Sequence, residues 1–349
     1  MKISPFKGFG SFGVYVDEVD FDNITNEEWM QIGRIHMTSL VTIIRNCNID
    51  PTKCVEYTDK WGSRRYSGML TISKHYPDIA AKDLIKLALK RDSRIDPEHI
   101  KVIENRFKTR APGGSQRVTD IRDKKGSHTG IFPDGELHWH SNEAGNPIFA
   151  PGVALLGNQN MKGSSTGFMQ TADYYQDVSE SFRSELDEMI IVHKYQPGKL
   201  HVKDLGEQER LMKMNMNPES ESRIPMVIQS PGGIKGLHYS LNTVDHIDGM
   251  SVEESHKLFE RMNTELKQER YVYDHWYQND NDWLFFDNSI TNHRRLGDVN
   301  GRLAFRVQHG YEHLEIPNYN PYFDNENCKI YDNKLNELNT FMSENFSES

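Results

Sequence analysis

The chain has 349 residues, of which 26% are charged, 36% hydrophobic and 10% aromatic, as in an ordinary globular protein. Its formal net charge of −10 argues against a general affinity for nucleic acid or an anionic membrane surface, and no apolar run approaches the roughly 18 residues of a membrane span. The three cysteines, Cys47, Cys54 and Cys328, fit neither a zinc ribbon nor a disulfide framework. With no secretory signal at the start, we expect a cytoplasmic protein of enzyme size.

Strand and helix patterns alternate in the first part of the chain. Residues 12–21, FGVYVDEVDF, alternate apolar and polar side chains and predict a strand. Thr25 and Glu28 match a capping box and predict the start of a helix. A β-rich run at 41–46, VTIIRN, predicts a second strand, and the apolar spacing of 79–92 predicts a second helix.

Three segments are expected outside the core. Residues 108–135 are rich in Gly, Pro and charge and predict a long loop broken by a strand. Residues 200–222 are polar with little core signal, and we expect them to form a lid together with that loop. The Asn- and Asp-rich tail at 317–349 is expected to be peripheral.

Strand patterns dominate the rest of the chain. Strands are expected at 152–159, 165–172, 224–230, 235–241, 271–277, 282–288 and 302–311. Helices are expected at 177–190 and at 251–269, the second beginning with a capping box from Ser251 to Glu254. Many short strands with few helices indicate a mainly β, α+β protein with a sandwich or barrel core. No domain boundary stands out, so we predict one domain over 1–349.

The motif GELHWHSNEAG at 135–145 contains the first candidate metal ligands. In an extended strand His138, His140 and Asn142 lie at alternate positions and face the same side. His293 follows a strand of bulky residues and some turn residues, and so lies near a strand end. Two imidazoles and a carboxylate on one face of a metal ion form the site of non-haem Fe(II) oxygenases. Arg302 and Arg306 share a strand face downstream, where a guanidinium would bind a dicarboxylate.

The order of these pieces resembles the taurine dioxygenase family. The pieces are GVYVDEVDF, VTIIRN, WH at 139–140, STGFM at 165–169, the segment 236–255, DHWYQNDNDWLFFDNSITNH at 274–293, and R-x-x-x-R at 302–306. The resemblance covers roughly residues 10 to 312 and extends to clavaminate synthase-like members. It implies an Fe(II)- and 2-oxoglutarate-dependent oxygenase on a double-stranded β-helix, or jelly-roll, core, with O₂ and a small molecule as its other substrates.

Carried over by position, the resemblance also implies a role for individual residues. His140 and His293 match the two iron-binding histidines. Arg302 matches the arginine at the far carboxylate of 2-oxoglutarate, and Thr166 the threonine that contacts the same co-substrate. Arg306 matches a second arginine, which contributes to binding the co-substrate or an anionic substrate.

Asn142 is the departure from the family pattern, which is His-x-Asp, or His-x-Glu in clavaminate synthase-like members. Several completions of the site stay open: Asn142 binds the metal through its amide oxygen, Glu143 turns in, or His138 makes a three-histidine site. Alternatively the position is left to chloride, as in family members that halogenate, or the protein binds no metal.

We therefore predict hydroxylation of a C–H bond in a small anionic or zwitterionic molecule of the sulfonate or amino acid type. A chloride-binding halogenase, a three-histidine oxygenase independent of 2-oxoglutarate, and a non-catalytic protein that binds a small anion are the alternatives. A homo-oligomer is compatible with the sequence.

Overall fold

The computed structural model describes most of the chain, namely residues 1–64, 115–122, 135–142, 150–194, 221–297 and 300–315, with a few single residues between and beyond these ranges. Several predictions lie outside this part: the helix at 79–92, the start of the loop at 108–135, nearly all of the segment 200–222, Glu143, and all but four residues of the tail 317–349.

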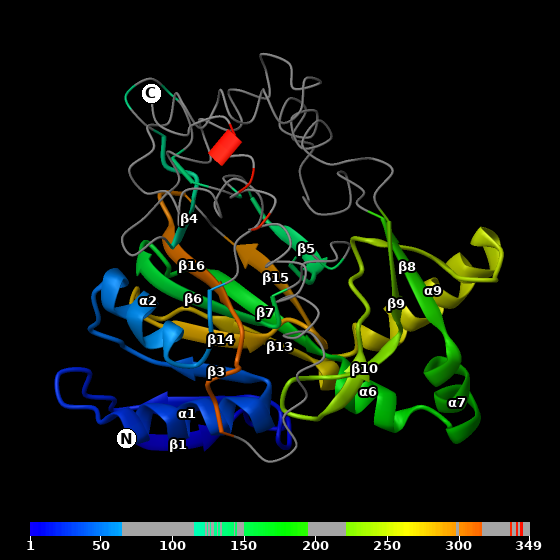
Figure 1. The fold of residues 1–349 in the computed structure, drawn as a ribbon, viewed down its shortest axis with the longest axis horizontal. Helices are drawn as coiled ribbons and strands as arrows, with labels where there is room; N and C mark the ends of the chain where they lie inside the picture. Colours follow the sequence, from blue (N-terminus) through cyan, green and yellow to red (C-terminus); the bar gives the residue numbers. More distant parts are fainter. Residues whose placement is uncertain are drawn as a thin grey trace.

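A seven-stranded sheet forms the larger half of the core (Figure 1). In spatial order its strands are β1 (Lys2–Pro5), β2 (Val14–Asp17), β3 (Val41–Ile44), β14 (Trp283–Asp287), β6 (Gly152–Gln159), β16 (Leu303–His309) and β4 (Gln116–Thr119). The pair β2–β3 is parallel and the other neighbours are antiparallel. Its central strands β3, β14 and most of β6 are buried on both faces, which explains their continuous apolar sequences.

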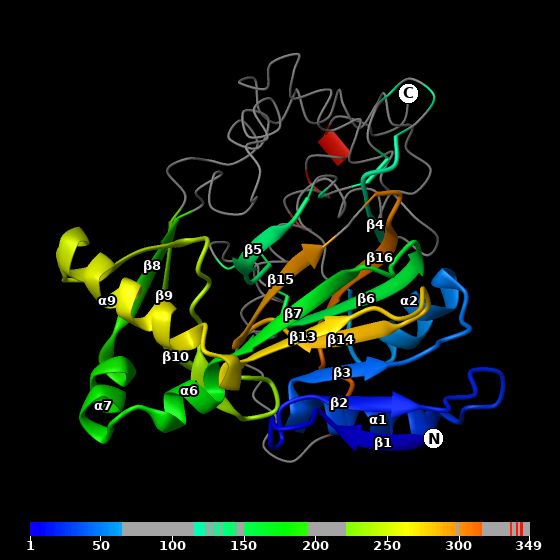
Figure 2. The same ribbon diagram turned by 180° about the vertical axis from the view of Figure 1, so that it is seen from behind.

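A four-stranded antiparallel sheet forms the other half. Its order is β13 (Val272–Trp276), β7 (Ser164–Gln170), β15 (Thr291–Gly297) and β5 (Leu137–His140). Figure 2 shows β7 of this sheet beside β6 of the larger one. Phe168 on β7 packs against Phe286 on β14 with ring centroids 5.4 Å apart, so the two sheets enclose a common apolar core.

Side-chain alternation along β14 connects this core to a second one on the outer face. Leu284 and Phe286 face the four-stranded sheet, whereas Trp283 and Phe285 face the helices. These helices are α1 (Asn26–Ser39) and α2 (Pro51–Asp59). Trp29 of α1 stacks on Trp283 with ring centroids 5.3 Å apart. The predicted capping box at the start of α1 is confirmed.

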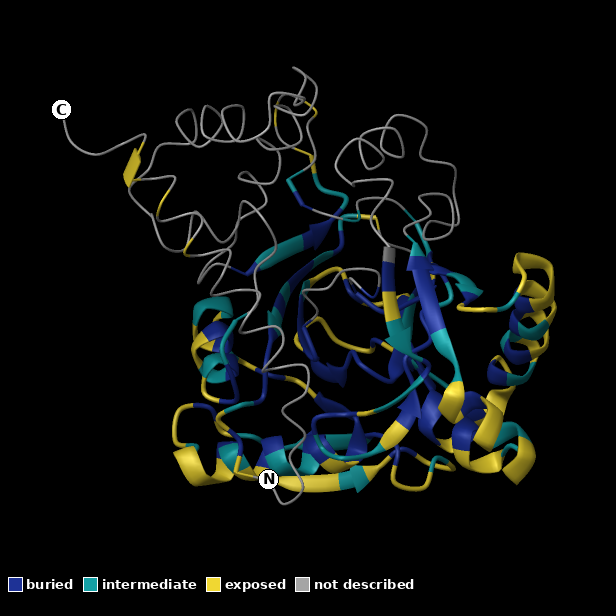
Figure 3. Ribbon diagram, turned by 45° about the vertical axis from the view of Figure 1, so that its right-hand side comes forward, coloured by how far each residue is buried: buried dark blue, intermediate teal, exposed yellow. Residues whose placement is uncertain are grey.

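A third apolar cluster lies beside the two sheets, among helices and short strands. The helical elements are α6 (Thr171–Asp177), α7 (Glu180–Glu188), α9 (Val252–Leu266) and the 3-10 turn η3 (Glu269–Tyr271). The strands form a sheet β12 (Val244–Ile247), β8 (Ile190–Lys194), β9 (Glu221–Pro225) and a hairpin β10 (Val227–Gln229), β11 (Lys235–Leu237). Figure 3 shows buried and exposed residues alternating along α9, whose predicted capping box is also confirmed. In the described ranges, no helix is long and apolar enough to cross a membrane.

Each segment predicted as a strand within the described residues contains one, but the sequence did not predict β1, β8, β12 or β15. Of these, β15 lies in the site. Its residues, TNHRRLG, are mostly polar, and their side chains make polar contacts. Asn292 donates to the carbonyl of Tyr239, Arg294 pairs with Asp274, and Arg295 donates to the carbonyl of Gly135. His293 is the third residue of this strand.

The turn from β14 to β15 is organised by one buried carboxylate, Asp287, which is 1% exposed. Its Oδ1 accepts hydrogen bonds from the backbone N–H groups of Ser289 and Ile290, at 2.9 Å each, and from the Ser289 hydroxyl. Burial raises the pKa of Asp287 from its usual 3.8 to about 6, although these hydrogen bonds oppose the rise.

We predict that Asp287→Asn weakens the pH dependence of stability. The folded protein holds the Asp287 proton more tightly than the unfolded chain, so the stabilisation is complete below about pH 4 and is lost as the pH rises through about 6. The unfolding free energy of the variant relative to wild type should therefore rise by about 3 kcal/mol over this range. Urea unfolding at several pH values measures it, with Asp22→Asn, at an exposed position, as a control expected to follow wild type. Parallel curves for Asp287→Asn and wild type would contradict the prediction.

Candidate active site

A cavity opens between the two sheets, with about 450 Å³ of empty space when its mouth is included. It is lined by six of the residues that the sequence singled out, namely His140, Asn142, Thr166, His293, Arg302 and Arg306. The other lining residues are Val118, Phe132, Leu137, Val153, Leu155, Phe286, Arg294 and Arg295. Polar groups from both sheets thus converge on a cavity whose remaining lining is apolar, as is usual for small-molecule sites.

The two histidines, 153 positions apart in the sequence, meet because β5 and β15 pair with His140 opposite His293. Their ring centroids are 4.0 Å apart and the rings are inclined at 47°. Nδ1 of His140 lies 2.8 Å from the backbone oxygen of His138 and donates to it, which leaves the lone pair on Nε2. Burial, with His140 and Arg306 nearby, lowers the pKa of His293 well below its usual value, so this imidazole is neutral, as a metal ligand must be.

His138 does not share the cavity face with His140. The register shifts between the two pairs His293–His140 and Arg295–Leu137, so that two residues of β15 match three of β5. Such a bulge reverses the alternation of side chains. Leu137 and His140 consequently both line the cavity, whereas His138 is exposed on the strand.

Asn142 follows β5 and is held through its backbone. Its N–H donates to Oδ1 of Asn288 at 2.8 Å, and its carbonyl accepts from Nδ2 of Asn288 at 2.9 Å. The side-chain Oδ1 accepts from Nη1 of Arg306 at 3.1 Å, while Nδ2 is buried and has no hydrogen-bond partner among the described residues. Those residues contain no cluster of three His, Cys, Asp or Glu side chains suited to a metal.

Arg302 carries a buried positive charge into the cavity. It is 2% exposed, its Nε donates to Sδ of Met161 at 3.4 Å, and its Nη1 is buried with no hydrogen-bond partner among the described residues. Burial lowers the pKa of Arg302, an effect that Tyr277 opposes. A buried guanidinium with an unused donor needs an anion. Thr166, also on the cavity wall, shares a hydrogen bond of 2.9 Å with the Tyr277 hydroxyl.

Arg306 contacts Asn142 with one side of its guanidinium and Gln116 with the other. Besides Asn142 it contacts Gln116, whose Oε1 accepts from Nε at 3.1 Å and from Nη2 at 2.6 Å. Its guanidinium carbon lies 5.4 Å from the centre of the Phe132 ring. Arg302 immediately precedes β16, and Ala304 and Arg306 lie on it. These three residues have alternate positions, so both arginines face the interior.

The structure adds residues that the sequence did not single out. Gln116, Tyr277 and Asn288 contact the predicted site residues directly. Arg295 donates to the backbone oxygens of Phe132 and Gly135 and so anchors the segment before β5. Only Arg295 could have been found from the sequence, because it lies two residues after His293 and faces the same side if the segment is a strand.

The donors present fit a divalent cation bound by two imidazoles, next to a dicarboxylate bound by buried arginine and hydroxyl groups. The fit is weaker at the third ligand, because the only side-chain oxygen that Asn142 offers is neutral and already accepts a hydrogen bond from Arg306.

The sequence matches the model of one protein family, described as taurine catabolism dioxygenase TauD, TfdA family, over residues 2–308. No curated protein matches the sequence closely enough to count as similar.

Solved structures resemble this one over most of its length. A crystal structure of AAD-2 in complex with Mn(II) and N-oxalylglycine has a TM-score of 0.60 and 19% identity, covering 88% of this chain and 97% of the other. A taurine dioxygenase from Burkholderia xenovorans has a TM-score of 0.60 and 15% identity, covering 88% of each chain. Identities this low indicate the fold alone, and with them the predicted jelly-roll core is confirmed.

We predict that Asn142→Asp tightens the binding of a divalent metal. A carboxylate adds a negative charge where the amide is neutral, while its oxygen still accepts from Arg306. Affinity for Mn(II), measured by calorimetry, should rise on the order of tenfold, the lower end of what changes around metal ligands cause.

Asn263→Asp is the matched control, because Asn263 uses its side-chain oxygen as an acceptor for Tyr239, away from the cavity. It should leave Mn(II) affinity unchanged, and His140→Ala should abolish binding. Equal Mn(II) affinities of Asn142→Asp and wild type would show that position 142 does not face the metal.

Proposed function

The chain belongs to the taurine catabolism dioxygenase TauD, TfdA family, and from this premise we propose how its residues carry out the family's reaction. It is an Fe(II)- and 2-oxoglutarate-dependent dioxygenase, as the sequence predicted. In the AAD-2 structure, Mn(II) stands for Fe(II) and N-oxalylglycine for 2-oxoglutarate. Neither halogenation nor a non-catalytic role receives support from these similarities.

His140 and His293 would hold the iron, and the convergence of their rings across β5 and β15 is the observation that carries this assignment. Asn142 would supply the third protein ligand through Oδ1. A carbonyl oxygen has two lone pairs, so Oδ1 can accept from Arg306 and also bind a metal. Such a ligand set is one negative charge short of the usual two histidines and a carboxylate.

Arg302 and Thr166 would bind the far carboxylate of 2-oxoglutarate. The support is the buried, unused Nη1 of Arg302 and the position of both side chains on the cavity wall. A carboxylate at that point would satisfy the guanidinium through charge-assisted hydrogen bonds.

When bound, iron supplies the activation of dioxygen, coupled to the conversion of 2-oxoglutarate into succinate and carbon dioxide, and so the power to oxidise a C–H bond. The protein's own residues orient and enclose the reactants. Val153, Leu155 and Phe286 form an apolar wall that excludes water from the reacting groups.

The substrate would be a small anionic or zwitterionic molecule of the sulfonate or amino acid type. Arg306 supports this, because its guanidinium lines the cavity beside Asn142 and can bind an anionic group near the metal. The taurine dioxygenase among the structural neighbours is a protein of the same fold that is named for a sulfonate. We further propose a cytoplasmic location, in agreement with the few cysteines, and a single domain over the whole chain.

The proposed function has a spectroscopic test. Anaerobic protein with Fe(II) and 2-oxoglutarate should develop a weak visible charge-transfer band, and His140→Ala should not. In air, small sulfonates and amino acids can then be screened for those that accelerate succinate formation. A wild-type protein that gives no band and forms no succinate would overturn the proposal.

We predict that Arg302→Gln weakens 2-oxoglutarate binding by at least about 30-fold. Removing one partner of a buried charge pair costs about 2 kcal/mol or more. Arg302→Lys should recover part of the loss, because the charge returns without the two-pronged geometry. The KM for 2-oxoglutarate in the succinate assay measures both variants, and values equal to wild type would contradict the assignment.

A further inference from the structure

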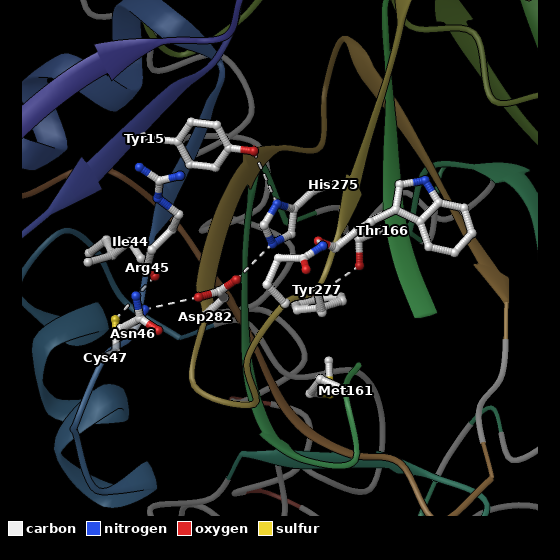
Figure 4. A network of polar contacts seen from close by, with 12 residues as sticks. Tyr15, Ile44, Arg45, Asn46, Cys47, Met161, Thr166, His275, Tyr277 and Asp282 are labelled. Carbon is white, nitrogen blue, oxygen red and sulfur yellow. Dashed lines mark hydrogen bonds and ion pairs between the residues drawn. The ribbon is translucent and has the colours of Figure 1, made fainter. Parts of the chain in front are cut away.

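The hydroxyl of Tyr277 lies behind the cavity wall, between two groups that face the cavity. Tyr277 is 1% exposed and lies outside the set of lining residues. Its hydroxyl is 2.9 Å from Oγ1 of Thr166 (Figure 4). The guanidinium carbon of Arg302 is 5.5 Å from the centre of the Tyr277 ring. Burial raises the pKa of Tyr277, against opposing contributions from Arg302 and from hydrogen bonds with Thr166 and Arg302. The hydroxyl therefore keeps its proton at neutral pH.

The bound co-substrate would fix the direction of the hydrogen bond between Tyr277 and Thr166. Their hydroxyl oxygens are 2.9 Å apart and either can donate. A carboxylate can only accept, so a carboxylate at Thr166 takes the Thr166 proton, and Tyr277 is then the donor to Oγ1. Arg302, whose guanidinium carbon lies beside the Tyr277 ring, can likewise only donate to that carboxylate.

Buried contacts hold Tyr277 in this place. Its backbone N–H donates to the carbonyl of Ser164 at 3.1 Å, and its ring meets that of His275 edge-on, with centroids 4.9 Å apart. Nε2 of His275 pairs with Oδ2 of Asp282 at 3.0 Å, and Oδ1 of Asp282 accepts from the backbone N–H of Asn46 at 3.0 Å. Figure 4 shows Asn46, Asp282 and His275 joined by these contacts, with Tyr277 and Thr166 beside them.

We propose that Tyr277 is a positioning residue for the co-substrate. Its hydroxyl orients Thr166 as a hydrogen-bond donor and holds Arg302, so that both point at the far carboxylate of 2-oxoglutarate. The proposal rests on the proposed function, because it assumes that this carboxylate binds at Thr166 and Arg302.

The test compares two ligands of the Mn(II)-loaded protein by calorimetry. 2-Oxoglutarate carries the far carboxylate, whereas oxalate chelates the metal without it. Tyr277→Phe removes only the hydroxyl. We expect the Kd of 2-oxoglutarate to rise by about 3- to 10-fold, the range of one lost hydrogen bond, and the Kd of oxalate to stay unchanged.

Tyr273→Phe is the matched control. Tyr273 lies on β13, the strand that directly precedes Tyr277, and its hydroxyl pairs with that of Tyr15 instead of a cavity residue. It should change neither Kd. In a Thr166→Val background, Tyr277→Phe should have a smaller effect than in wild type, because the two hydroxyls act together.

The other possible results would contradict either the role of Tyr277 or the assignment of the carboxylate site. An unchanged Kd of 2-oxoglutarate in Tyr277→Phe, or equal losses for both ligands, would overturn the role of Tyr277 while leaving the proposed function intact. If neither Arg302→Gln nor Thr166→Val changed the Kd of 2-oxoglutarate, the assignment of Arg302 and Thr166 would be overturned as well.

Discussion

The pairing of β5 with β15 is the constraint on which the site depends. It sets His140 opposite His293 and brings two imidazoles from distant parts of the chain to one point. β15 also pairs with β7, where Thr166 lies opposite Arg295. The larger sheet then closes the cavity from the other side, where Arg302, just before β16, and Arg306, on β16, line it. Because ligands come from several strands held by backbone hydrogen bonds, the site inherits the rigidity of the two sheets.

Charge is the second feature that organises this cavity. Its described lining residues include four arginines and two histidines but no Asp or Glu. Arg294 is paired with Asp274, which lies outside the lining set, while Nη1 of Arg302 has no partner among the described residues. A bare divalent cation therefore meets a less favourable field here than in a site with a carboxylate ligand, and an anionic ligand meets a more favourable one. The dianionic co-substrate suits such a cavity better than the metal alone.

The sequence predicted the residues that meet in the cavity better than the geometry that joins them. Short apolar runs such as 152–159 and 282–288 identified the buried strands, and the resemblance supplied the order of the histidines and arginines. The expected common face of His138 and His140 was wrong, because a bulge depends on the partner strand and leaves no mark in a single segment. Tyr277 and Asn288 were missed for a related reason. They act on residues more than a hundred positions away, through contacts that only the fold creates.

Asn142 differs from the family pattern in its side chain, whereas its backbone is held firmly in place. Both backbone hydrogen-bonding groups of residue 142 are engaged by the side chain of Asn288, and Asn288 also donates to the carbonyl of Ala150. Asn288 in turn follows Asp287, whose buried carboxylate organises the turn into β15. The place of residue 142 beside His140 and His293 is thus fixed by groups that do not depend on its own side chain. Under the proposed assignment, the amide at position 142 therefore alters the charge offered to the metal, whereas the backbone that presents this side chain is held independently of it.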